Sequence, residues 1–347
     1  MPATALDDRR REVLRTLIQL HVDTGEPVGS ESLCRALGRA LSPASLRNLM
    51  ADLEALGYLD HPHTSAGRVP TDEGYRVFVD SLMGPRPLAP GEQRAIAELG
   101  QGEASAEQTL ERASQVLSRL SRNVGFVLAP DIARTSFRHI DLVPLGHPRV
   151  LVVMVSATGI VTHKVIDVEE RLEPAQAQEC ANYLNTHFSG MPLDAIRGRL
   201  VELMQEEKAL YDSLLQRVAA VGERAFAPPE TGASVYLDGA SNVLSQPEFE
   251  DVERMRALFR TFEEKGRLVR ILNACIAGDG IRVLIGHENP DPELQDLSLV
   301  TTTCRVEGEP AFGVGVLGST RMQYAHVVSI VDHVARAVSD VLRVKRA

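Results

Sequence analysis

The sequence of 347 residues contains no tryptophan, and aromatic residues make up only 4% of it, so its cores are predicted to be aliphatic. No apolar run reaches the roughly 18 residues that a membrane-spanning helix needs, so no membrane association is expected. Residues 1–11 are charged and lack the apolar stretch of a signal peptide, which predicts a cytoplasmic protein. The scattered cysteines, without C-x-x-C spacing, favour a reducing compartment and predict neither a disulfide framework nor a zinc site: Cys34, Cys180, Cys275 and Cys304.

Catalytic motifs are also missing. No G-x-S-x-G, Walker loop or H-E-x-x-H occurs, so no catalytic residue, cofactor or enzymatic activity is predicted. Residues 313–318 match G-x-G-x-x-G, but only one helix is predicted after them, and we attribute their glycines to tight strand packing. His61 and His63 have metal-ligand spacing without a carboxylate or cysteine nearby in sequence, so no metal is predicted there. Residues 287–291 could suggest acid–base chemistry, but Asn-Pro-Asp-Pro is a turn signature and predicts an edge loop.

The charge balance argues against a protein that coats nucleic acid. The net charge is −10 and the pI is about 5.5. Even residues 1–83 contain nine arginines against twelve aspartates and glutamates. Binding to DNA must therefore depend on where a few arginine side chains point, which favours a specific site over bulk duplex.

A helix-turn-helix is predicted near the N-terminus. The apolar spacing predicts a helix over residues 7–24, and Ser30 is a suitable N-cap for a second helix over residues 31–37. Ser42 followed by proline is a strong signal for a third helix that ends near residue 56. Arg47 and Asn48 lie opposite its apolar face, together with Ser45 and Asp52. Arginine can make two hydrogen bonds to guanine and asparagine can do the same with adenine, so this helix is predicted to recognise bases.

A wing is predicted directly after this third helix. Residues 57–59 form a short apolar strand, and a polar loop follows in which Gly67 is expected to adopt a positive φ. Arg68 is expected at the tip of the wing, before a return strand that begins at Val69, and residues 71–83 form a fourth helix. The predicted DNA-binding residues are Ser42, Ser45, Arg47, Asn48, His63, Thr64, Ser65, Gly67 and Arg68.

The remaining chain alternates between helices and strands after a proline-rich linker at residues 84–91. Helices are predicted at residues 92–99, 107–123, 174–188, 193–221 with a break near Gly198, 248–262 and 324–344. Strands are predicted at residues 137–143, 149–156, 159–168, 233–237, 268–275, 281–287, 297–306 and 312–317, with a tight turn at 157–159.

These elements predict an α+β, multidomain protein with an N-terminal winged helix-turn-helix. An antiparallel sheet flanked by helices resembles a GAF-type small-molecule sensor, and the block of three strands and two helices is interpreted as an insertion into it. The predicted divisions are residues 1–84 for the winged-helix DNA-binding domain, 85–104 for a linker and short helix, 105–129 and 226–347 for the GAF-like domain, and 130–225 for an inserted dimerising domain.

Several segments together resemble the bacterial heat-inducible transcription repressor HrcA family. They occur in the family's order over the whole chain: residues 26–30 (Glu-Pro-Val-Gly-Ser), 41–48, 51–54, 63–76 (His-Thr-Ser-Ala-Gly-Arg-Val-Pro-Thr-Asp-Glu-Gly-Tyr-Arg), 286–289 and 315–324. The wing motif at residues 63–76 is the most specific of them. Ser319 departs from the pattern, because the family usually has proline at this point of the local turn.

The resemblance implies a negative regulator of chaperonin and other heat-shock operons. Such a repressor binds double-stranded DNA at an inverted-repeat operator as a homodimer, needs no cofactor, and is kept folded and active by chaperonin until heat diverts the chaperonin to unfolded clients. The proline-rich linker is expected to let the winged domains reach separated half-sites. Two alternatives stay open: a metabolite-responsive winged-helix repressor that uses the GAF-like domain as a ligand sensor, and an enzyme tethered to DNA, which no motif supports.

Overall fold

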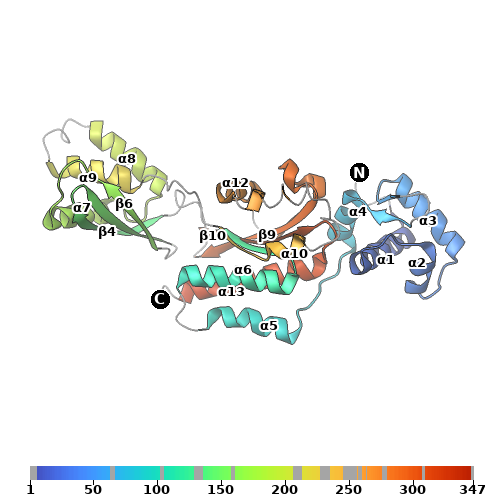
Figure 1. Cartoon of the computed structure of the whole chain (residues 1–347). Coiled ribbons are helices and arrows are strands. Elements are labelled where there is room, and N and C mark those ends of the chain that lie inside the picture. The colour runs from blue at the N-terminus through green and yellow to red at the C-terminus, as the bar shows by residue number, and fades with distance from the viewer. Residues whose placement is uncertain are drawn as a thin grey trace.

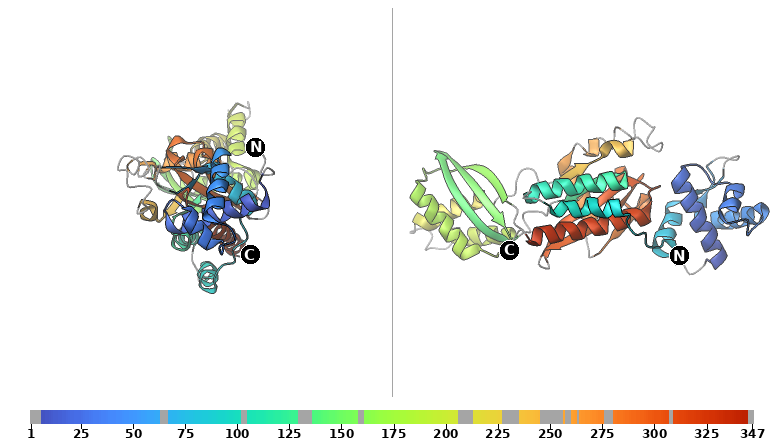
Figure 2. Two further views of the ribbon diagram at one scale, coloured as in Figure 1. Left: turned by 90° about the vertical axis from the view of Figure 1, so that its right-hand side faces the viewer. Right: turned by 90° about the horizontal axis from the view of Figure 1, so that it is seen from below.

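The molecule is elongated, with the winged helix at one end and a small sheet covered by helices at the other (Figures 1 and 2). The computed structural model describes residues 6–62, 67–101, 105–128, 136–157, 161–205, 213–226, 235–244, 256, 260–262, 264–275, 280–306 and 309–344. Within these residues, no helix combines the length and apolar character needed to cross a bilayer.

The N-terminal part has the predicted winged helix-turn-helix fold. Its elements are α1 (Asp8–Thr24), α2 (Ser30–Ala36), α3 (Pro43–Ala55), β1 (Leu59–Asp60), β2 (Val69–Pro70) and α4 (Asp72–Val77), which continues as a π-helical turn (Phe78–Leu82). Asp7 caps α1, and the side chain of Thr71 caps α4. The N-cap of α2 is Gly29 and not Ser30, so this helix begins one residue earlier than predicted.

The middle of the molecule is built on an antiparallel sheet. Its five described strands have the order β7 (Val235–Asp238), β3 (Val124–Leu128), β10 (Glu309–Ser319), β9 (Leu297–Val306) and β8 (Arg282–Ile285). The long helices α6 (Ala106–Ser121) and α13 (Tyr324–Val344) cover one face, and α12 (Lys265–Cys275) lies on the other (Figure 1). Two shorter helices complete this part, α5 (Pro90–Ala97), followed by a 3-10 turn (Glu98–Gly100), and α10 (Ala240–Leu244).

The glycines of the G-x-G-x-x-G match lie inside strand β10, where backbone and rings approach closely. A Cβ added to Gly315 would lie 2.5 Å from Cζ of Phe126 and 2.6 Å from the carbonyl oxygen of Val300. A Cβ on Gly318 would lie 2.1 Å from the side-chain oxygen of Asn123. At Gly315 and Gly318, therefore, the predicted reason for glycine, tight strand packing, is confirmed.

The segment interpreted as an insertion forms the other end of the molecule. Strands β4 (Phe137–Gly146), β5 (Arg149–Ser156) and β6 (Val161–Asp167) form an antiparallel sheet in that order. Helices α7 (Pro174–Phe188), α8 (Leu193–Gln205) and α9 (Ser213–Ala225) accompany it. Alternate residues of the strands pack against apolar residues of the helices in one hydrophobic core. This core includes Ile140, Val150, Val152, Leu184 and Leu200.

Several predicted elements differ in the structure. The predicted strand at residues 268–275 is wrong, because these residues form helix α12; Leu268, Leu272 and Cys275 are buried at helical spacing. Strand β3 was not predicted, although all five of its residues are buried. The predicted break near Gly198 is also wrong, because α8 passes through this position. Residues 158–159 of the predicted turn, and most of the predicted helix at 248–262, lie outside the described residues.

Candidate nucleic-acid interface

Helix α3 presents the predicted base-reading face to solvent. Its start is fixed by Ser42, whose side-chain oxygen accepts a hydrogen bond of 3.1 Å from the backbone N–H of Ser45, and by a proline in the first turn. Residues at helical spacing bury one face of the helix against the domain core: Leu46, Met50 and Leu53. Because that face is committed to the core, the exposed positions fall on the opposite side of the helix: Ser42, Ser45, Arg47 and Asn48.

The guanidinium of Arg47 also connects the two helices of the helix-turn-helix. Its Nε donates a hydrogen bond of 3.3 Å to the hydroxyl of Ser30, at the start of α2. This bond uses only one of the five N–H groups of the guanidinium. The N–H groups of the two Nη atoms can still donate to two acceptors on one base, such as O6 and N7 of guanine. Asn48 lies on the same exposed surface, one residue further along. The contacts of Arg47 and Asn48 with bases stay a prediction.

Asp52 is exposed on α3 as predicted, and its side chain forms an ion pair with another helix of the domain. Its carboxylate lies 2.6 Å from Nη2 of Arg10, and Nη1 of Arg10 lies 2.6 Å from Asp7. The hydrogen bond to Asp52 raises the pKa of Arg10, and the backbone N–H of Arg10 lowers the pKa of Asp7. Arg10 thus ties the start of α1 to α3 and fixes the orientation of the recognition helix. The contact between Asp52 and Arg10 was not predicted from the sequence, because it joins two helices.

The wing contains a contact that the sequence did not reveal. Strands β1 and β2 pair antiparallel, and Arg68 also pairs with Val28, whose N–H donates 2.9 Å to the carbonyl of Arg68. Gly67 does not adopt the predicted positive φ. A Cβ at Gly67 would lie 2.3 Å from the carbonyl carbon and oxygen of Val28. Glycine is therefore required by the close approach of two backbones, and not by a left-handed turn.

Arg68 is not at the tip of the wing, so that prediction is wrong. Its Nε donates a hydrogen bond of 2.8 Å to Glu54, and its side chain is 20% exposed. The ion pair holds the guanidinium beside the C-terminal half of α3. The predicted wing residues His63, Thr64 and Ser65 lie outside the described residues. Contact of Arg68 with phosphate stays a prediction.

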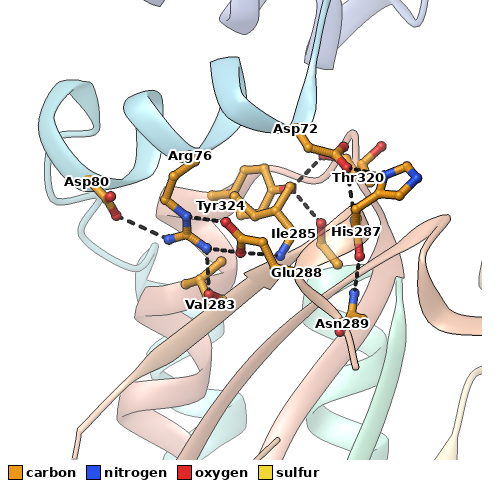
Figure 3. Close-up of polar contacts among 12 residues, drawn as sticks. Asp72, Arg76, Asp80, Val283, Ile285, His287, Glu288, Asn289, Thr320 and Tyr324 are labelled. Atoms are coloured by element: carbon orange, nitrogen blue, oxygen red, sulfur yellow. Dashed lines mark hydrogen bonds and ion pairs between the residues drawn. The ribbon is translucent and has the colours of Figure 1, made fainter. Parts of the chain in front are cut away.

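The second half of the wing motif contacts a segment that is distant in sequence. Asp72 and Arg76 of α4 contact Gly286–Glu288, which forms a 3-10 turn after strand β8 (Figure 3). The segment at 287–291, predicted to be an edge loop, is thus part of a junction between two parts of the molecule. The sequence signal for this junction was the occurrence of both segments among the family motifs, but their pairing was not predicted.

The fold and the exposed face of α3 define a winged-helix DNA-binding protein. A family model described as the winged helix-turn-helix transcription repressor HrcA, DNA-binding, matches residues 5–82, and one described as the HrcA protein C-terminal domain matches residues 107–328. Proteins named heat-inducible transcription repressor HrcA are similar over almost their full length. The protein of Geobacter sulfurreducens is 42% identical over 98% of this chain and 99% of its own, and that of Syntrophobacter fumaroxidans is 36% identical over 97% of each chain.

The chain therefore belongs to the HrcA family of heat-inducible transcription repressors, which bind DNA through the winged helix and are not enzymes. A crystal structure described only as that of a hypothetical protein shares the fold. Its TM-score is 0.63, with 22% sequence identity, and the match covers 98% of this chain and 99% of that one.

Proposed function

We propose that this repressor binds an inverted-repeat operator of chaperonin and related chaperone operons as a homodimer. The observation that carries the proposal is the exposed face of α3, where Ser45, Arg47 and Asn48 lie beside the wing. The net charge of −10 supports a specific site over bulk duplex, because the general attraction to phosphate is weak. In this proposal Ser42 and the wing residues His63, Thr64, Ser65, Gly67 and Arg68 contact the DNA backbone or the adjacent groove.

The domain divisions of the sequence analysis are part of this proposal. The winged-helix domain spans residues 1–84, followed by the linker and short helix at 85–104. Residues 105–129 and 226–347 form a GAF-like domain, which is supported by its antiparallel sheet with α6 and α13 on one face. Residues 130–225 form the inserted dimerising domain, which is supported by its separate hydrophobic core.

The outer face of the sheet β4–β5–β6 is the surface that we assign to dimerisation. Val143, Leu151 and Val165 lie opposite one another across the three strands. Their side chains point away from the core of this end, and Val143 and Val165 are 45% and 53% exposed. A second apolar pair, Val155 and Val161, lies further along the same face. The row between these apolar residues contains Asp141, Val153 and His163, so the face is mixed. An isologous dimer would bury the same face of both copies, and its two-fold axis matches an inverted repeat.

Heat release is proposed to occur through the folded fraction of the repressor, and chaperonin is proposed to restore that fraction. A domain is stabilised by only about 5–15 kcal/mol, so a small loss on heating can move much of the protein into inactive forms. A folding partner shifts the active pool by mass action, without a cofactor or a ligand. The metabolite-responsive repressor is the alternative, in which a small molecule bound by the GAF-like domain takes the place of chaperonin.

The test is a fluorescence anisotropy titration of the purified protein with a chaperonin-promoter inverted repeat. A single half-site and a shuffled duplex of equal length are the controls. We expect two chains per inverted repeat in sedimentation, weak binding to one half-site, and no preference for the shuffled duplex over bulk DNA. After mild heating, the binding-competent fraction should fall, and chaperonin added before the heat should preserve it. If chaperonin has no effect at any temperature while a small molecule shifts this fraction, the metabolite-responsive repressor replaces this proposal.

A further inference from the structure

The winged helix is docked on the sheet domain by a set of polar contacts that we call the clasp: Asp72 and Arg76 of α4 with His287 and Glu288 after β8. Figure 3 shows these side chains between helix α4 and the end of the sheet. The two halves of the clasp are more than two hundred residues apart in sequence, with a separation of 212 between Arg76 and Glu288. The clasp joins the end of the molecule that carries α3 to the rest of it.

Arg76 and Glu288 form a bidentate pair. Nε of Arg76 donates 2.7 Å to one carboxylate oxygen of Glu288, and Nη2 donates to the other. Nη2 also donates 2.7 Å to the carbonyl of Val283, and Nη1 contacts Asp80 at 3.1 Å. Glu288 additionally accepts 2.9 Å from the backbone N–H of Ile285. The fork of the guanidinium therefore fixes both the distance and the direction between α4 and β8.

Asp72 forms the second contact of the clasp. One of its carboxylate oxygens accepts a hydrogen bond of 2.9 Å from the backbone N–H of His287, and Nδ1 of the same histidine lies 2.8 Å from that oxygen. A Cβ on Gly286 would lie 2.0 Å from this carboxylate, so only glycine permits the approach. Asn289 keeps the turn in place, because its amide nitrogen donates to the carbonyls of Gly286, Leu294 and Leu297.

Apolar and backbone contacts continue the docking beside the clasp. The rings of Tyr75 and Tyr324 lie 5.7 Å apart between centroids, and Nη1 of Arg321 donates 3.2 Å to the carbonyl of Val22 at the end of α1. The hydroxyl of Tyr324 is itself held by Thr320 and Ser298. Buried residues of the winged helix and of the α6–α13 face belong to one continuous core. The linker is therefore not the only connection between the two parts.

We propose that the clasp sets the separation of the two recognition helices in the dimer, and so selects the spacing between operator half-sites. This inference rests on the proposed function, in which two copies bind one inverted repeat. The recognition helix lies at one end of the elongated molecule, and the surface assigned to dimerisation lies at the other (Figure 1). A rotation at the clasp would therefore displace α3 relative to the two-fold axis. A proline-rich linker without the clasp would let each winged helix reach several spacings at lower effective concentration.

The experiment compares Arg76→Gln, Glu288→Gln and the double variant with the parent protein in the full-length chain. Arg336→Gln is the matched control, because Arg336 forms an ion pair of 2.7 Å with Asp332 on α13, away from the clasp. Affinity is measured for identical half-sites separated by spacers of increasing length, and for one half-site alone. The parent and the control should show one preferred spacer. The clasp variants should bind that spacer about tenfold or more weakly, with a flatter profile and an unchanged half-site affinity.

The double variant should lose no more than Arg76→Gln alone, because Arg76→Gln already removes the pair with Glu288 together with the contacts to Val283 and Asp80. Clasp variants that keep the parent's spacing profile would overturn the proposal, and so would a parent that binds every spacer equally. A parent that binds no inverted repeat would instead overturn the proposed function. In that case hydrogen exchange at the His287 amide tests whether the clasp residues hold the winged helix on the sheet domain. Asp72→Asn is added as a further variant. Faster exchange in the clasp variants than in the parent supports docking by these residues, and equal exchange contradicts it.

Discussion

Arg68 and Glu54 form an ion pair, with Nη2 2.7 Å from Oε2, that joins the wing to helix α3. The two residues are fourteen positions apart, and the wing returns to α3 at this point. The pair is partly buried, with 20% of the Arg68 side chain and 34% of the Glu54 side chain exposed. Arg68 therefore links the wing to α3, in addition to its proposed contact with phosphate.

Replacing Arg68 by alanine should weaken binding to many sequences alike and reduce the slope of log K against log salt by about one unit, because one phosphate contact is lost. Glu54→Gln is the control, since it disturbs the same pair and keeps the positive charge. The control should retain the slope of the parent. If Arg68→Ala and Glu54→Gln weaken binding equally with an unchanged slope, Arg68 acts only by orienting the wing.

Replacing Arg47 by alanine should cost about 1–3 kcal/mol of operator binding and relax specificity at one base position. The reason is the loss of a bidentate contact to a base from an exposed position on α3. Binding is measured on the operator and on a set of single-base variants, with Arg336→Ala of α13 as the control for loss of charge. Operator affinity and base preference equal to the parent's would show that Arg47 does not read a base. Arg47→Ala also removes the hydrogen bond to Ser30, so the melting temperature of the variant is measured to show whether the fold is destabilised.

Replacing Val165 by aspartate should convert the dimer into a monomer, because a charge on the edge strand β6 would have to be buried in the proposed interface. Val165 is 53% exposed, so the fold should be preserved. Val150→Ala is the matched control: Val150 faces the opposite side of the sheet and is 1% exposed, so this variant should lose stability and stay dimeric. Analytical ultracentrifugation gives the result. If the Val165→Asp protein is still a dimer, the dimer interface does not include this face of the sheet.

The thiol of Cys304 should report when the sheet domain opens on heating. Burial raises the pKa of Cys304 to about 12, so almost no thiolate forms near pH 8, and its Sγ lies 3.5 Å from the carbonyl of Ala335 on α13. We expect slow alkylation at low temperature and fast alkylation over the temperatures at which operator binding is lost. The label is located by mass spectrometry, with the half-buried Cys34 as an internal comparison. Loss of binding while Cys304 stays protected would argue against release through unfolding of this domain.

The sequence determined the elements whose signals are local. Caps and apolar periodicity predicted α1 and α3 to within two residues, and the predicted bounds of α13 and β5 are those of the structure. Where two patterns compete in a short apolar segment, the local signal failed: α12 was predicted as a strand, and β3 was missed. The exposed positions of Arg47 and Asn48 followed from helix geometry alone, because burial of one face dictates the other.

Only the tertiary structure decided how the winged helix is docked on the rest of the molecule. The pairing of Arg76 with Glu288, and of Asp72 with His287, joins residues whose separation in sequence leaves no local pattern. The pairing of Arg68 with Glu54 could not be predicted from the sequence for the same reason. The two side chains are close only because the wing folds back onto α3. Caps and periodicity act within a few residues of one helix or strand, whereas ion pairs between elements depend on how those elements pack.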